Sequence, residues 1–146
     1  MNPRAHRRVK QSERLAAARV VARLMARDGR LDWREIEFLD RSNAYALLGV
    51  SRERFMVLLA QCAGERWGAR AAGRNSERES DLAAVRERRL QLIAVALLVY
   101  VCEIDRTIEP RESALVERAF GQWSITPGCS RASCACRRRA RAPRLN

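Results

Sequence analysis

The octapeptide DGRLDWRE at positions 28–35 occurs a second time, in the altered form DRTIEPRE, at positions 105–112. The two copies lie 77 residues apart, and the same offset aligns Leu39 with Val116 and Arg41 with Arg118. Each copy follows an apolar stretch with helical spacing and precedes another such stretch. We therefore interpret the chain as two copies of one unit, each made of a helix, an acidic corner and a second helix.

The composition favours helices over strands. Only 5% of the 146 residues are aromatic, whereas Ala, Leu, Val and Arg are abundant, which is typical of helical rather than β-rich domains. The length fits one domain with a real core. The sequence predicts an all-α fold, a compact bundle of about five to seven helices built from the two pseudo-repeated units.

Capping residues and apolar periodicity place the individual helices. The first expected helix has Ser12 as its N-cap and runs to about Arg27, and the second is capped by Asp32 and ends at Gly49. The third is capped by Ser51. The fourth runs unbroken from Ser80 or Asp81 to Ile104, and the fifth begins at Pro110. One stripe is expected along the fourth helix, made of Leu82, Val85, Arg89, Ile93, Ala96 and Tyr100. The segment 123–126 echoes the segment 48–51, but no periodic helix follows it. The core beside Phe120 and Trp123 is thus expected to lack a cover.

Positive charge is concentrated outside the helical region. The net charge is +12, and we divide the chain into a basic lead-in (1–11), a helical domain (12–127) and an Arg/Cys-rich tail (128–146). Both a natural disordered extension and the product of a shifted reading frame have the composition of this tail. Nucleic acid is not expected as a partner except through the Arg-rich tails, and association with it through these tails stays an alternative function; weak contact with an anionic membrane is a second electrostatic outcome.

The apolar runs and the cysteines indicate a cytoplasmic protein. The longest apolar run, Leu92 to Cys102, is too short to span a bilayer, and no secretory signal is recognised at the N-terminus. Cys62 and Cys102 lie on apolar helical faces and are expected to be buried thiols.

The motifs that carry this organisation resemble the TerB-like family, which is named after a tellurite-resistance protein. The resemblance rests on the helix followed by Asp-Gly-x-Leu-Asp-x-x-Glu, on the Leu-Gly-Val-Ser step at 48–51 and on the second copy, and it covers residues 12–126. It implies an all-helical, internally pseudo-symmetric, non-enzymatic accessory protein of the stress response. In the second copy Arg106 replaces the glycine that stands at position 29, and the last helix of that unit is missing.

The resemblance also implies a divalent-metal site at the acidic corners. The matching residues are Asp28, Asp32 and Glu35 in the first corner, and Asp105, Glu109 and Glu112 in the second. Hard cations of the calcium or magnesium class prefer such oxygen ligands. An alternative stays open, because Asp32 with Glu35 and Glu109 with Glu112 also have the spacing of helix N-terminal capping boxes. In that case the protein is a helical interaction module without metal, whose partner is another protein.

Other chemistry is not indicated. Position 12 of a calcium loop counted from Asp28 is Leu39, which excludes an EF-hand. Cys129, Cys134 and Cys136 lack the paired spacing of a zinc knuckle. The single histidine, His6, lies in the lead-in and leaves the domain without a Ser–His or Cys–His pair, so we expect no enzyme.

Overall fold

The computed structural model describes residues 9–26, 32–67, 80–104 and 110–125. Within these ranges the chain forms helices and no strands, which confirms the all-α prediction. The helices are α1 (Gln11–Met25), α2 (Trp33–Arg41), α3 (Ala44–Leu48), α4 (Arg52–Trp67), α6 (Arg88–Ile104) and α7 (Pro110–Gln122). A short helix over residues 80–84 precedes α6.

The predicted duplication is visible in the helix positions. Helices α1 and α6 begin at residues 11 and 88, and α2 and α7 begin at 33 and 110, so both pairs keep the offset of 77 residues. Burial also repeats at this offset: Leu24 and Val101 are both buried, as are Leu39 and Val116. The same face of each first helix, and the same face of each second helix, is therefore turned to the core.

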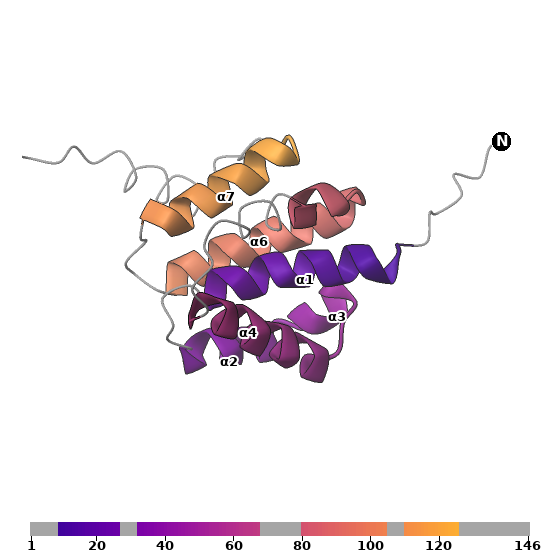
Figure 1. The fold of residues 1–146 in the computed structure, drawn as a ribbon. Coiled ribbons are helices and arrows are strands. Elements are labelled where there is room, and N and C mark those ends of the chain that lie inside the picture. Colours follow the sequence, from indigo (N-terminus) through magenta and orange to yellow (C-terminus); the bar gives the residue numbers. More distant parts are fainter. Residues whose placement is uncertain (1–8, 27–31, 68–79, 105–109, 126–146) are drawn as a thin grey trace, which may run out of the picture.

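Helix α1 lies in the middle of the bundle (Figure 1). It packs against α4 on one side and against α6 on the other, and α7 packs on α6. Helices α2 and α3 contact each other and α6. Helices α1 and α6 run side by side in the same direction, so that their C-terminal ends lie at the same end of the bundle (Figure 1).

The core is formed by side chains from both units. The largest fully buried ones include Phe55, Met25, Leu39, Leu48 and Leu98. The inner face of α4 consists of Phe55, Leu58, Leu59 and Cys62, all of them buried. Cys62 and Cys102 are buried free thiols, also as predicted.

One helix start and one helix interior differ from the prediction. Helix α1 begins one residue before Ser12, with Lys10 as its N-cap and Glu13 in its first turn. The expected continuous second helix is divided into α2 and α3, because Asn43 adopts a left-handed conformation with φ of 58°. Asparagine tolerates this conformation better than other residues with side chains, which explains the break at this position.

The expected unbroken helix from residue 80 to Ile104 is wrong. The chain leaves the helix at residues 85–87 and starts again at Arg88. The Glu87 carboxylate accepts a hydrogen bond of 2.7 Å from the backbone N–H of Leu90 and so caps the new helix. The interruption shifts the buried stripe by one residue: Leu90, Ala94, Leu97 and Val101 are buried instead of Arg89, Ile93, Ala96 and Tyr100.

The predicted echo between segments 48–51 and 123–126 is confirmed at its described positions. Gly49 (φ 73°) and Ser124 (φ 50°) are both left-handed. After α3, the Val50 N–H donates to the Tyr45 carbonyl, and the Gly49 N–H donates to the Ala46 carbonyl. The same pair of bonds follows α7: the Ile125 N–H donates to the Phe120 carbonyl, and the Ser124 N–H donates to the Gly121 carbonyl. The segment after α3 and the segment after α7 therefore form the same Schellman motif.

The core was expected to lack a cover beside Phe120 and Trp123; Trp123 is buried, whereas Phe120 is only half-buried. The Trp123 side chain is 4% exposed, and its indole Nε1–H donates to the Leu82 carbonyl at 2.8 Å. The Arg88 guanidinium donates to the Trp123 carbonyl. No helix in the described part of the chain is long and apolar enough to cross a membrane.

Candidate functional site

The structure describes part of the first acidic corner and little of the second. Asp32 and Glu35 belong to the described residues. Asp28, Asp105 and Glu109 lie outside them, and so does the side chain of Glu112, whose backbone is in α7. The C-terminal tail with Cys129, Cys134 and Cys136 also lies outside the described residues.

Asp32 is the N-cap of α2, as predicted. Its backbone is extended, and Oδ1 accepts a hydrogen bond of 2.9 Å from the backbone N–H of Arg34. The Arg34 Nε lies 3.6 Å from the same oxygen. One oxygen of this carboxylate thus satisfies the start of the helix, and the arginine beside it would compete with a cation for the same charge.

Glu35 lies one turn into α2 on its inner side. Its side chain is only 6% exposed and shares the buried side of the helix with Leu39. A carboxylate at this depth is costly unless other groups compensate it. Protein groups rather than solvent therefore surround most of the Glu35 carboxylate.

The parallel packing of α1 and α6 gives the two corners a common location. At their N-terminal ends, the Glu13 carboxylate of α1 accepts a hydrogen bond of 2.9 Å from the backbone N–H of Arg86, two residues before α6. From there both helices run in the same direction and lead into the corners at the opposite end (Figure 1). The helix ends that flank the two corners are thus brought to one end of the molecule.

A ligand set is not assembled by the described residues alone. Among them, no three His, Cys, Asp or Glu side chains converge as they would around a metal ion. Of the six residues in the hypothesis, the structure places the side chains of Asp32 and Glu35 on α2 at this end, on the exposed start and the inner face of the helix. The side chains of the other four lie outside the described part of the chain.

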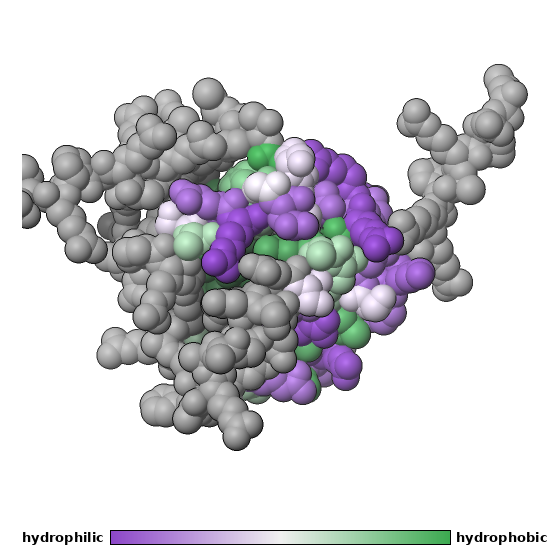
Figure 2. Space-filling model, turned by 45° about the horizontal axis from the view of Figure 1, so that its top comes forward, coloured by the Kyte–Doolittle hydropathy of each residue, from purple (hydrophilic) through white to green (hydrophobic). Residues whose placement is uncertain are grey.

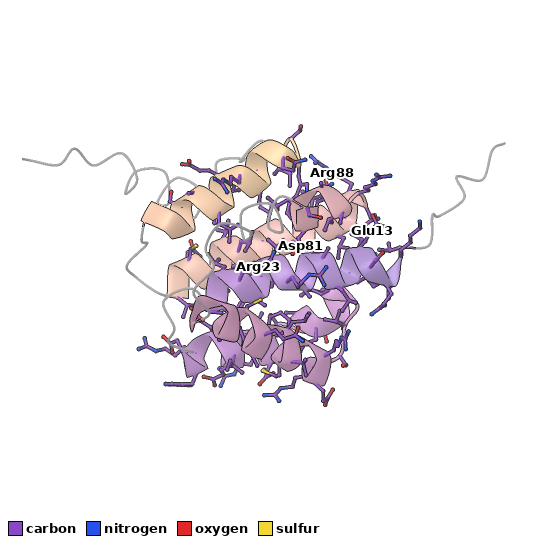
Figure 3. The ribbon with its side chains drawn as sticks, viewed as in Figure 1. Glu13, Arg23, Asp81 and Arg88 are labelled. Carbon is purple, nitrogen blue, oxygen red and sulfur yellow. The ribbon has the colours of Figure 1, made fainter. Side chains whose placement is uncertain are left out.

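The most heavily charged interior cluster was not predicted. Asp81, on the short helix 80–84, lies between two arginines of α1 and is 6% exposed. Its Oδ1 accepts from Arg19 Nε at 3.0 Å, and Oδ2 forms an ion pair with Arg23 (Figure 3). The sequence offered one signal: two arginines four residues apart on a face otherwise occupied by apolar side chains.

A second cluster joins α2, α3 and α4 at the surface. Asp40 accepts from Arg52 Nε at 2.9 Å, and this guanidinium lowers the pKa of the Asp40 carboxyl. Burial, with Asp40 adding to it, raises the pKa of Tyr45 to about 12. Tyr45 is therefore protonated at neutral pH and unsuited to act as a base. This cluster holds elements together and does not have the properties of a catalytic site.

Comparison of the chain with family models, with curated proteins and with solved structures finds no match.

Proposed function

We propose that this chain is a non-enzymatic, cytoplasmic accessory protein of the TerB-like, tellurite-resistance type. In this proposal it binds a divalent cation of the calcium or magnesium class through its acidic corners. The candidate ligands are those of the sequence hypothesis: Asp28, Asp32, Glu35, Asp105, Glu109 and Glu112.

One observation carries the proposal: α1 and α6 pack in parallel, so the helix ends that flank the two corners lie at the same end of the bundle. An antiparallel arrangement would have placed the corners at opposite ends. A hard cation takes six to eight oxygen ligands. Each corner contributes three carboxylates, and in the first corner one oxygen of Asp32 already accepts the backbone N–H of Arg34. The shared end is the place where two incomplete sets can complement each other.

The proposal predicts that the cation stabilises the fold. The full chain, stripped with a chelator, is melted alone and then with calcium, magnesium, manganese or zinc. A cation at about 100 times its dissociation constant adds about 2.7 kcal/mol to the free energy of unfolding, which raises Tm by several degrees in a domain of this size. A shift with one or two of these ions and not the others supports a site.

The ligand assignment is tested by the pair Asp28→Asn and Asp105→Asn. Neither residue is an N-cap, so the double variant removes two charges and leaves the helix starts intact. We expect it to lose most of the cation-induced shift. The control is Glu53→Gln, which removes an exposed acid from the first turn of α4 and should keep the full shift. Equal shifts in both variants would remove the corners from the ligand list.

The second candidate is a helical interaction module without metal, and the capping bond from Arg34 N–H to Asp32 favours it. Here the melt is flat with all four ions. Asp32→Ala should then cost about 0.5–2 kcal/mol, because the cap is lost. Asp32→Asn should cost little, because asparagine caps as well as aspartate. If Asp32 is a metal ligand, Asp32→Asn should instead reduce the cation-induced rise in Tm, since asparagine keeps the cap and loses the charge.

A further inference from the structure

The outward face of α6 carries an exposed stripe of five residues, which is independent of the corners. The stripe consists of Arg89, Leu92, Ala96, Tyr100 and Glu103, all of them exposed. Their spacing of three or four residues places them on one side of the helix. Leu92 is 47% and Tyr100 52% exposed, which is high for large apolar side chains. The stripe is about 21 Å long at 1.5 Å per residue.

The repeat shows that the corresponding stripe of α1 is covered. At the offset of 77 residues, Leu92, Ala96 and Tyr100 correspond to Leu15, Arg19 and Arg23. The short helix 80–84 is attached to that stripe through the ion pairs of Asp81 with both arginines. Leu15, Arg19 and Arg23 are all half-buried, whereas their three counterparts on α6 are exposed. Within the described part of the chain, no helix covers this face of α6 as the helix 80–84 covers that of α1.

The order of residues in this stripe is symmetric about its centre. Arg89 and Glu103 each lie seven residues from Ala96, and Leu92 and Tyr100 each lie four residues from it. A helix that lies antiparallel across Ala96 with the same sequence would therefore oppose arginine with glutamate at both ends. It would also oppose leucine with tyrosine on both sides of the centre. The small side chain of Ala96 allows two helices to approach closely at the crossing point.

We infer that α6 binds α6 of a second copy of this chain in a twofold-symmetric, antiparallel dimer. The twofold axis passes near Ala96, Arg89 pairs with the partner's Glu103, and Leu92 packs on the partner's Tyr100. An interface of this kind is self-complementary, as closed dimers require. Among the described residues, Arg89 and Glu103 have no ion pair within the chain and are available for it.

Two further observations favour a second copy over other occupants. Phe38 of α2 lies next to Tyr100, with 5.4 Å between the ring centroids, and extends the apolar surface beside the stripe. The chain's own segment 126–146 is a poor complement, because it contains six arginines and no apolar periodicity. The stripe is narrow, so we expect a weak dimer with a dissociation constant on the order of 0.1 mM.

The test is sedimentation equilibrium of the full chain from about 10 µM to about 1 mM, a range that spans the expected dissociation constant. Arg89→Glu places two glutamates opposite each other at each end of the interface, so this variant should be monomeric. Glu103→Arg places two arginines opposite each other at each end and should also be monomeric. An equimolar mixture of these two variants restores opposite charges at both ends and should dimerise. The double variant Arg89→Glu with Glu103→Arg should dimerise on its own.

The control is Arg54→Glu, which makes the same charge change at an exposed arginine of α4 and should leave the monomer–dimer equilibrium unchanged. Far-UV circular dichroism establishes that each variant is folded. A wild-type chain that stays monomeric up to the highest concentration would overturn the inference. So would a dimer that Arg89→Glu leaves intact, or two single variants that fail to associate when mixed.

Discussion

Asp81 attaches the short helix 80–84 to α1 through two arginines. It is buried between Arg19 and Arg23, and Arg23 is itself only 10% exposed at its side chain. Removing one partner of a buried ion pair leaves an uncompensated charge in a poorly solvated place. The neighbouring Leu82 carbonyl accepts the Trp123 indole, so a displacement of this short helix also affects α7.

We predict that Asp81→Ala lowers the free energy of unfolding by about 3 kcal/mol, because Arg23 keeps its buried position without a counter-charge. Urea denaturation followed by circular dichroism measures this change. The control is Glu37→Ala, which breaks the exposed pair with Arg41 in α2 and should cost less than about 1 kcal/mol. Similar losses in the two variants would show that the Asp81 pairs are no stronger than surface pairs.

Single residues were predictable from the sequence where their role is local. Ser51 was expected as a cap, and its hydroxyl accepts from Arg54 N–H at 3.1 Å. The partners of Glu13 and Asp81 were not identified. They lie 73 and about 60 residues away in the chain, and local sequence patterns do not report contacts over such separations. For the same reason the sequence located the acidic corners but could not tell whether they meet.

At the scale of elements, α3 and α7 end in the same motif with different residues. Gly49 after α3 and Ser124 after α7 occupy equivalent left-handed positions. Glycine adopts this conformation without steric cost, whereas an L side chain is strained there by about 1 kcal/mol. A Cβ at Gly49 would also meet the Arg14 side chain, with the nearest atom at 2.7 Å.

The two positions should therefore respond in opposite directions. We predict that Gly49→Ser destabilises the fold by about 1–2 kcal/mol, through backbone strain and displacement of the Arg14 side chain. Ser124→Gly relieves strain and should stabilise it by about 0.5 kcal/mol, after the larger entropy of the unfolded chain is subtracted. Thermal melts of the two variants decide this. A loss of stability in Ser124→Gly would mean that the serine contributes interactions that outweigh its strain.

Helix types and most boundaries followed from periodicity, but the interruptions did not. Neither glycine nor proline marks the break at residues 85–87, and the sequence there continues a helical apolar spacing. The break occurs because Glu87 caps a new helix and Arg86 N–H is used by Glu13. The one-residue shift of the α6 stripe follows from this tertiary contact, so the outward position of Tyr100 could not be foreseen.

At the scale of the molecule, α1 joins the two units into one cooperative core. It packs against α4 of its own unit and against α6 of the other. Its buried side chains, such as Val20, Val21 and Met25, belong to a cluster that includes Leu59 and Leu98. Neither unit can lose its packing without exposing part of α1.

We predict that both units unfold in a single transition. In the variant Trp33→Phe with Trp67→Phe, Trp123 is the remaining tryptophan of the three in the chain and reports on α7 and helix 80–84. Its fluorescence change in urea should coincide with the loss of helical circular dichroism. An earlier fluorescence transition, with most of the helix signal retained, would show that the second unit unfolds separately.

The parallel course of α1 and α6 also aligns their peptide dipoles. At one end the partial positive charges of two N-termini lie together, and the carboxylates of Glu13 and Glu87 oppose them. At the other end, the partial negative charges of α1 and α6 meet the partial positive charges that begin α2 and α7, so the backbone contributions offset each other. The side chains then set the potential at this end. The segments 28–35 and 105–112 contain six acids and four arginines, so together they are acidic in sequence although the net charge of the chain is +12.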